Sequence, residues 1–231
     1  IGDTGDIPRA DVDSRGLSVL TSRLPLDVDC VWASNVAGTG FGKRLKAIMD
    51  VHCGCDVHFA RVEGRAHGVT NSYEQPRNMG VDRWVAMVGA WAREQQACLI
   101  VDAGTAVTID ALDDDGRHLG GQIMPGVRLM SQALSNGTSD IPPLDVRPEP
   151  ASGWEGLFGN STSAAVALGS VNAIVGAIER AVRTMRKHDY APRIVLTGGD
   201  ASRMLDLLDE PAQHRPNLVL SGLVQMLEEH R

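Results

Sequence analysis

The chain has 231 residues, of which 43% are hydrophobic and 22% charged, and its formal net charge is −7 at pH 7. These values are typical of a globular protein with one large or two compact domains. The acidic balance, the lack of an apolar run of about 20 residues and four cysteines without a disulfide framework lead us to expect a cytoplasmic protein with neither a nucleic acid nor a membrane as partner.

The first half of the chain predicts short strands alternating with helices. Residues 1–25 have a weak apolar pattern and suggest surface strands or loop. Apolar runs and helical spacing then predict, in turn, a strand, a helix, a strand and a helix, at Cys30–Ser34, Gly40–Asp50, Val57–Val62 and Val81–Arg93. The segment 71–80, just before the last of these, is rich in turn-forming residues.

The second half predicts three consecutive antiparallel strands followed by helices. The strands are expected at Ala97–Ala103, Ala106–Leu112 and Arg117–Ile123. Further helices are expected at about Val127–Leu134 and Ser163–Lys187, on either side of a Pro- and Gly-rich loop over 135–160. A further strand is expected at Arg193–Leu196, with a short helix after Asp200. A strand-like run at Leu218–Leu220 then leads into a C-terminal helix.

The turn between the first two of these strands, Asp102-Ala-Gly-Thr105, is a candidate phosphate-binding device. Gly104 allows backbone N–H groups to approach phosphate oxygens closely, and Thr105 adds a hydroxyl donor. Asp102, at the strand end, can hold a cation that bridges the phosphates. A plain hairpin with a convenient glycine is the alternative.

Two further glycine-bearing turns strengthen the prediction of a nucleotide site. Thr197-Gly-Gly-Asp200 follows a strand and precedes a helix, where the backbone donors of Gly198 and Gly199 can meet a phosphate or ribose. Gly120–Gly126 likewise leads from a strand towards a helix. Each turn alone is equally consistent with a glycine needed for positive φ. Three of them in one half of the chain favour a nucleotide cleft.

The segment Gly80-Val-Asp-Arg83 is a candidate acceptor site at the start of a helix. Asp82 has the chemistry of a general base, and Arg83 that of a clamp for an anion or hydroxyl. Tyr73, on the preceding turn-rich loop, can supply a wall and a hydroxyl group. The alternative is an ordinary helix cap with an ion-pair partner.

Together these motifs resemble those of type III pantothenate kinases. The matching segments occur in the family's order and spacing, as Gly80–Trp84, Asp102–Ala106, Gly120–Gly126 and Thr197–Gly199. The resemblance extends from about Trp32 to the C-terminus and includes Asn160-Ser-Thr162. It implies an α/β fold of the actin-like ATPase type, in which two RNase-H-like domains have mixed sheets flanked by helices. We place these domains at 1–96 and 97–231.

The resemblance also implies residue roles for ATP-dependent phosphorylation of pantothenate to 4′-phosphopantothenate, the first step of coenzyme A biosynthesis. Asp82 would be the catalytic base. Asp102 would ligate a monovalent cation, K⁺ or NH₄⁺, with Mg²⁺ accompanying the nucleotide. The pantothenate contacts would be Tyr73, Gly80, Val81, Asp82, Arg83 and Thr162. The nucleotide contacts would be Gly104, Thr105, Gly198 and Gly199. Family members resemble homodimers with the substrate pocket close to the subunit interface.

One family element has no counterpart in this sequence. The family pattern begins with a strand ending in Asp-x-Gly-Asn-Thr/Ser, and Ile1-Gly-Asp-Thr-Gly5 has similar letters without a preceding strand. The first domain is therefore expected to be incomplete at its N-terminus, either because the sequence lacks a segment or because the loop has been lost. In the second case ATP binding would be impaired, which favours a non-catalytic accessory protein of transcription on the same fold. A kinase of the same superfamily for another hydroxylated substrate is a third possibility.

Several other features are interpreted as structural. Cys53 and Cys55 lie in a His- and Cys-containing stretch that lacks the usual spacing of a zinc site. Cys98 is expected in the core, and His118 is expected to be structural. Residues 113–115 suggest a hairpin tip, and the tryptophans Trp84 and Trp91 suggest core or dimer contacts.

Overall fold

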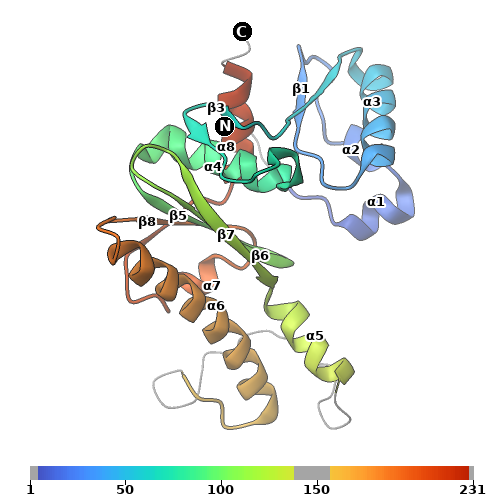
Figure 1. Ribbon diagram of the computed structural model, residues 1–231. Coiled ribbons are helices and arrows are strands. Elements are labelled where there is room, and N and C mark those ends of the chain that lie inside the picture. Colours follow the sequence, from blue (N-terminus) through green and yellow to red (C-terminus); the bar gives the residue numbers. More distant parts are fainter. Residues whose placement is uncertain (1–4, 138–156, 229–231) are drawn as a thin grey trace.

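The computed structural model describes residues 5–137 and 157–228, which form an α/β protein (Figure 1). Two short helices come first, α1 (Arg9–Arg15) and α2 (Ser18–Thr21), where the sequence led us to expect strands or loop; that expectation was wrong. The apolar pattern of the first 25 residues is too weak to separate a short helix from a strand.

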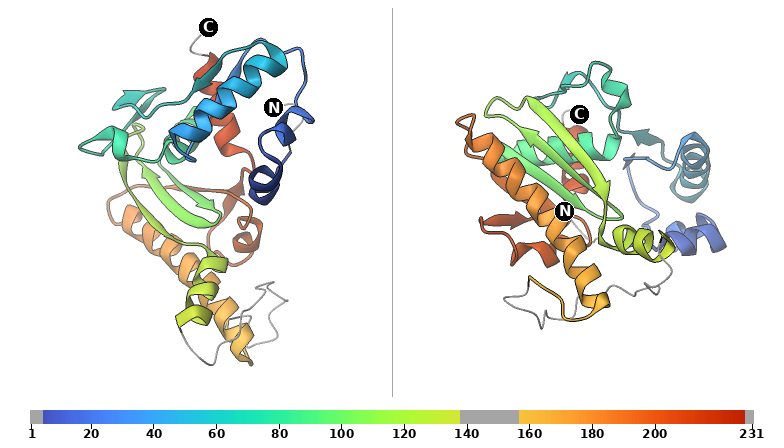
Figure 2. Two further views of the ribbon diagram at one scale, coloured as in Figure 1. Left: turned by 90° about the vertical axis from the view of Figure 1, so that its right-hand side faces the viewer. Right: turned by 60° about the horizontal axis from the view of Figure 1, so that its bottom comes forward.

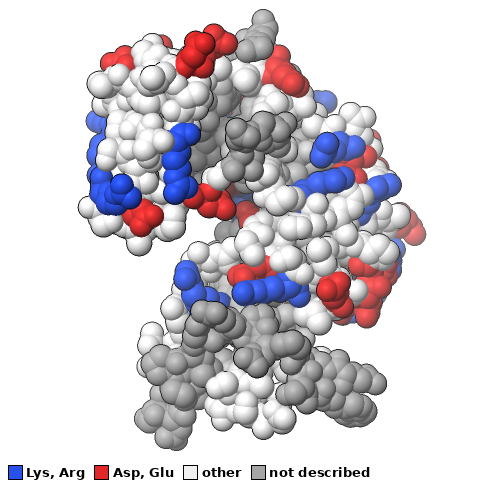
Figure 3. All heavy atoms as spheres, turned by 180° about the vertical axis from the view of Figure 1, so that it is seen from behind, with Lys and Arg blue, Asp and Glu red and all other residues white. Residues whose placement is uncertain are grey.

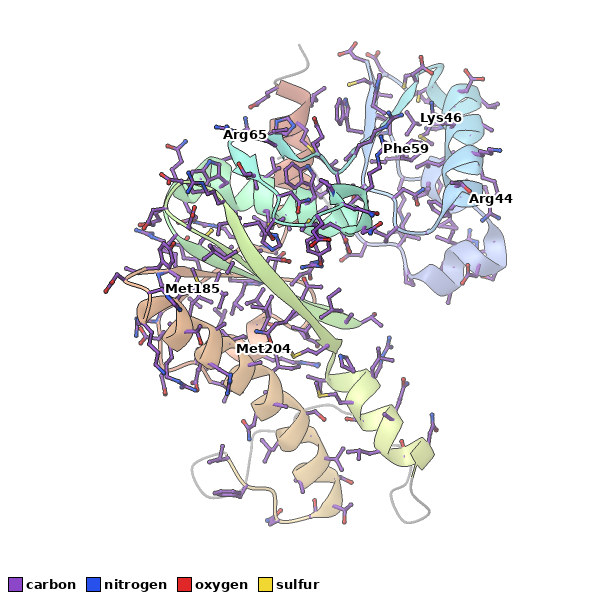
Figure 4. The ribbon with its side chains drawn as sticks, viewed as in Figure 1. Arg44, Lys46, Phe59, Arg65, Met185 and Met204 are labelled. Atoms are coloured by element: carbon purple, nitrogen blue, oxygen red, sulfur yellow. The ribbon has the colours of Figure 1, made fainter. Side chains whose placement is uncertain are left out.

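A parallel β–α–β unit follows. Strands β1 (Val31–Ala33) and β2 (Val57–Phe59) pair in parallel, and helix α3 (Thr39–Cys53) connects them. Phe59 packs onto α3 at Gly42, where a Cβ atom would lie 3.4 Å from its ring (Figure 4). The expected strand–helix–strand order is confirmed.

A small hairpin and a helix connect this unit to the main sheet. Strands β3 (Arg65–Ala66) and β4 (Val69–Thr70) pair antiparallel, and a 3-10 turn, η1 (Pro76–Asn78), follows in the turn-rich segment. Helix α4 (Val81–Glu94) begins after Gly80 and is almost wholly buried over its middle turns.

The main sheet has five strands in the order β7-β6-β5-β8-β9. In chain order, the first three of these strands form an antiparallel meander. The fourth strand pairs in parallel with the first of them on one side and with the fifth on the other. The bounds are β5 (Cys98–Ala103), β6 (Ala106–Leu112), β7 (His118–Pro125), β8 (Arg193–Thr197) and β9 (Ala212–His214). This mixed sheet, covered by helices on both faces, is the arrangement expected of an RNase-H-like domain.

Helix α6 (Thr162–Arg186) lies across one face of this sheet (Figure 2). It is long and apolar enough to span a membrane by composition, but Ile174 and Ile178 are fully buried in the core that it forms with the sheet. Met185 and Met204 lie in the same core (Figure 4). The helices α5 (Val127–Gly137) and α7 (Ser202–Leu205) complete this side.

The opposite face is covered by α4 and the C-terminal helix α8 (Leu218–Glu228), which pack against each other. At their crossing, a Cβ atom on Gly89 would lie 2.6 Å from the carbonyl oxygen of Leu218, and one on Gly222 would collide with the carbonyl of Val85. The glycines therefore allow the two backbones to touch. Since α4 precedes residue 97, the two units that we predict share one hydrophobic core; the division itself remains a prediction.

Two expected elements of the C-terminal half differ from the structure. Residues Leu218–Leu220 begin α8 and do not form a strand; Leu218 is buried in the core with α4, whereas Leu220 is exposed. The last strand is instead β9, at residues 212–214, which has too few apolar residues to be found by its pattern. Most of the loop predicted over 135–160 lies outside the described residues.

Candidate active site

The three glycine-bearing turns meet at one edge of the five-stranded sheet, where β5 and β8 end. The backbone N–H of Gly126 donates to the carbonyl oxygen of Thr105 (2.9 Å), and that of Asp200 donates to the carbonyl oxygen of Ala103 (2.9 Å). Asp102 pairs with Thr197 of β8 across the sheet. The turns predicted to form one nucleotide site are thus adjacent in space.

Gly198 and Gly199 differ in their surroundings. Gly198 has φ +90° and packs against Asp102, whereas Gly199 has an ordinary φ and open space where a Cβ would lie. Positive φ and backbone contact require a glycine at the first position. The surrounding structure does not require a glycine at position 199. We therefore attribute Gly199 to the close approach of a ligand.

The turn Gly104-Thr105 is open to solvent. Thr105 is exposed, and Gly104 donates its N–H to the carbonyl oxygen of Ala106 (3.1 Å), which closes a tight turn. Gly126 packs directly against the carbonyls of Gly104 and Thr105, and any side chain there would collide with them. The turn is therefore held from the β7–α5 side while the hydroxyl of Thr105 stays accessible.

Asp82 lies in the first turn of α4 and electrostatically couples to Asp102. Its Oδ1 accepts a hydrogen bond from the backbone N–H of Arg83 (2.8 Å), and a Cβ on Gly80 would lie 2.5 Å from the same oxygen. Burial, and next to it the charge of Asp82, raises the pKa of Asp102 above its ordinary value. The charge of the expected base therefore acts on the expected cation ligand.

Tyr73 and Val81 line the same end of α4. Tyr73 is half-buried, and its backbone N–H donates to Oδ1 of Asn71 (2.9 Å), which fixes the loop before the helix. Val81 is also half-buried and packs beside it against the core under α4. Gly80, Val81 and Asp82 are consecutive at the start of α4, and Tyr73 is joined to this helix through its hydrogen bond with Arg83.

Arg83 is buried in an ion pair that the sequence did not reveal. It donates through Nε to Oδ2 of Asp110 (2.9 Å) and through Nη2 to Oδ1 (2.5 Å), and His118 contacts the same Oδ1 (3.0 Å). Only 5% of Arg83 is exposed, and its guanidinium is engaged by Asp110 and Tyr73; its contact with pantothenate remains a prediction. An acid within the apolar run Ala106–Leu112 is the signal that could have identified Asp110.

Thr162 is not brought to this site by its own chain. It is the first residue of α6, whose N-terminal end projects away from the sheet and from α4 (Figures 1 and 2). Ser161 caps this end by accepting a hydrogen bond from the N–H of Ala164 (3.2 Å). Thr162 itself is exposed.

From behind, the surface has a deep notch between the lobe of the N-terminal helices and the body of the sheet (Figure 3). Acidic and basic side chains both lie around this notch. Among the ranges that the structure describes, no group of three or more His, Cys, Asp or Glu side chains is placed to hold a metal ion. A cation at Asp102 would therefore need ligands from the backbone, from water or from the nucleotide.

Comparison with solved structures supports the fold. A crystal structure from Campylobacter jejuni, assigned to the Baf family of transcriptional activators, matches with a TM-score of 0.63 at 20% identity, over 93% of this chain and 88% of that one. At this level of identity the likeness concerns the fold alone.

Sequence comparison identifies the family. A family model described as type III pantothenate kinase matches residues 6–184. A type III pantothenate kinase of Thiobacillus denitrificans is 36% identical over 218 residues, which cover 94% of this chain and 86% of that protein. One of Dechloromonas aromatica is 38% identical over 219 residues, which cover 95% and 87%. The chain therefore belongs to the type III pantothenate kinase family.

Proposed function

We propose that this protein transfers the γ-phosphoryl group of ATP to the primary hydroxyl of pantothenate, with Asp82 as the base. The observation that supports the proposal is the influence of the Asp82 charge on Asp102, at the strand end where the glycine-bearing turns meet. A carboxylate next to a phosphate-binding edge is what transfer to an alcohol needs, since the reaction depends on positioning and charge neutralisation.

In this reaction the acceptor oxygen forms a bond to the γ-phosphorus while the bond to the bridging oxygen of ADP breaks. The hydroxyl proton passes to the carboxylate of Asp82. Backbone N–H groups at Gly104 and Gly198–Gly199, with the hydroxyl of Thr105, would stabilise the phosphate charge. Mg²⁺ would accompany the nucleotide.

We propose that a monovalent cation binds beside Asp102. The carboxylate is partly buried next to the charge of Asp82, and among the described side chains no Lys or Arg forms an ion pair with it. A K⁺ or NH₄⁺ ion held there would neutralise part of this negative charge before the phosphates of ATP enter.

We also propose a cytoplasmic homodimer with the pantothenate pocket close to the subunit interface. The projecting end of α6 supports this arrangement, because Thr162 is exposed and remote from α4 of its own chain. A second copy would allow Thr162 to reach the pocket.

The test is a coupled ADP-release assay on the full-length gene product, with and without pantothenate, in K⁺ and in Na⁺ salts. We expect ADP release that requires pantothenate and is faster in K⁺. If neither salt supports pantothenate-dependent turnover, the kinase assignment is wrong. The accessory role is not favoured, since the relatives at 36% and 38% identity are kinases by name.

A further inference from the structure

A buried chain of hydrogen bonds connects the candidate active site to the interior of the sheet. It runs from Tyr73 through the buried residues Arg83, Asp110 and His118 and returns at Ser72, an exposed residue of the same loop as Tyr73. The hydroxyl of Tyr73 lies 2.8 Å from Nη1 of Arg83, and Oγ of Ser72 lies 3.0 Å from Nδ1 of His118. Arg83, Asp110 and His118 are only 5%, 2% and 3% exposed. Such a network fixes the geometry of its members when every polar group is satisfied.

The direction of each bond follows from which groups can donate. A guanidinium has no acceptor, so Arg83 donates to the oxygen of Tyr73. The phenolic hydrogen of Tyr73 is then not used within the network and is free to donate elsewhere. Tyr73 is half-buried on the loop before α4, and its hydroxyl is held by Arg83, the residue that follows Asp82 in the chain.

The same reasoning fixes His118. Burial works to raise the pKa of Asp110, but hydrogen bonds from His118 and Arg83 outweigh it and hold this pKa below its ordinary value. Asp110 is therefore a carboxylate, and His118 must donate to it through Nε2–H. Nδ1 of the same ring lies within hydrogen-bond distance of Oγ of Ser72. The ring of His118 also stacks on that of Tyr73, with centroids 6.0 Å apart.

The sheet makes room for this ion pair at one position. Gly121 of β7 lies opposite Asp110 of β6, and a Cβ there would collide with both Nη2 of Arg83 and Oδ1 of Asp110. Gly121 belongs to the motif Gly120–Gly126, which we interpreted as a nucleotide turn. The structure places Gly121 within a strand, where its lack of a side chain accommodates the Arg83–Asp110 pair.

We propose that Asp110 and His118 are positioning residues for pantothenate phosphorylation, because they hold Arg83 so that the hydroxyl of Tyr73 donates to the substrate. This inference rests on the proposed function. The substrate group that it requires is an acceptor oxygen, either a carboxylate or a carbonyl. Asp110 and His118 act only through Arg83 and Tyr73 and contact no reacting atom.

The test is a double-mutant cycle with Tyr73→Phe and Asp110→Asn, in which KM is measured separately for pantothenate and for ATP. Tyr73→Phe removes one hydrogen bond and should lower kcat/KM for pantothenate about tenfold. Asp110→Asn should lower it at least as much, with KM for ATP nearly unchanged. The double variant should be no worse than Asp110→Asn alone. Effects that multiply, or equal increases in both KM values, would overturn the positioning role.

A second pair of variants covers the case in which Asp110→Asn does not fold. His118→Gln retains an amide N–H donor for Asp110 and should keep most of the activity, whereas His118→Leu should lose about as much as Tyr73→Phe and not add to it. Equal activity of the two His118 variants contradicts the proposal. Turnover of the unsubstituted protein is measured first: its absence overturns the proposed function, whereas turnover with additive variants overturns only the positioning role.

Discussion

Gly198 packs its Cα directly against the carboxylate of Asp102, so that a Cβ atom on Gly198 would lie 2.5 Å from Oδ1 of Asp102 and 2.5 Å from the carbonyl oxygen of Ala103. This contact joins the end of β8 to the end of β5. The two turns that we assign to the nucleotide are therefore in direct contact, and the N–H of Asp200 also donates to the carbonyl oxygen of Ala103.

Gly198→Ala should therefore weaken ATP binding and reduce stability, because alanine must adopt φ +90° and collide with Asp102. The left-handed conformation alone costs about 1–2 kcal/mol. The matched control is Gly199→Ala, which meets nothing within 4 Å and should leave the melting temperature nearly unchanged. An increase in KM for ATP with normal stability in the Gly199 variant would show close approach of the nucleotide. Equal melting temperatures for the two variants would contradict the geometry at Gly198.

Asp82→Asn should remove most turnover while leaving pantothenate binding largely intact, since an amide cannot accept the hydroxyl proton. The expected loss is about 10²–10⁴-fold in kcat. Calorimetric titration with pantothenate, beside the ADP-release assay, separates the two effects. Asp115→Asn, at the exposed hairpin tip, is a control that should alter neither. Equal loss of binding and turnover in the Asp82 variant would make Asp82 a binding or folding residue.

The order of elements could be predicted because periodicity and glycine-bearing turns are local signals. The meander β5–β7 and the helices α3, α4 and α6 are where the sequence predicts them. Strand β9, at residues 212–214, could not be found, because it has too few apolar residues and its strand form depends on pairing with β8. The C-terminal helix was predicted, but its first residues, Leu218–Leu220, were interpreted as a strand-like run, because so short an apolar run has no period that separates a helix from a strand.

The candidate site was predictable where a motif carries the chemistry and not where a partner lies elsewhere in the chain. Asp82 and Asp102 stand out in their own motifs, and their roles remain predictions. Arg83 also belongs to a motif, yet its partner Asp110 lies 27 positions away on β6. A buried carboxylate needs such a partner, and which cation supplies it is a property of the fold.

Asp102→Asn should weaken the dependence of turnover on K⁺. Burial and the charge of Asp82 raise the pKa of Asp102, so this carboxyl group binds its proton more tightly in the folded protein than in the unfolded chain. The free energy of unfolding therefore falls as pH rises from 3.8 through the raised pKa. K⁺ should offset this loss. Replacing Na⁺ by K⁺ at constant ionic strength should therefore raise the melting temperature at neutral pH more than near pH 3.8. An unchanged K⁺ requirement in the variant would place the cation site elsewhere.

Asp110→Asn should destabilise the protein by about 3–5 kcal/mol at neutral pH, because it leaves the buried charge of Arg83 without its partner. The pKa of Asp110 is lowered, so its contribution is present above the ordinary value of 3.8 and is lost as pH falls through the lowered value. The difference from the unsubstituted protein, measured by urea unfolding, should thus shrink in acid below pH 3.8. A difference that does not depend on pH would mean that packing, and not charge, dominates at this position.

Gly222→Ala should destabilise the crossing of α4 and α8, and through it the start of α4 that carries Asp82. A Cβ on Gly222 would collide with the backbone carbonyl of Val85, which cannot move without shifting the helix. We expect the free energy of unfolding to fall by at least about 1–3 kcal/mol, as for other overpacked cores.

Gly176→Ala is the matched control, because Gly176 lies on the exposed surface of α6 and a Cβ atom there would meet nothing within 4 Å. It should stabilise the protein by about 0.5–1 kcal/mol, because alanine restricts the unfolded chain. The two substitutions are chemically identical, so opposite shifts in melting temperature would locate the helix contact at Gly222, and shifts of the same sign would contradict it.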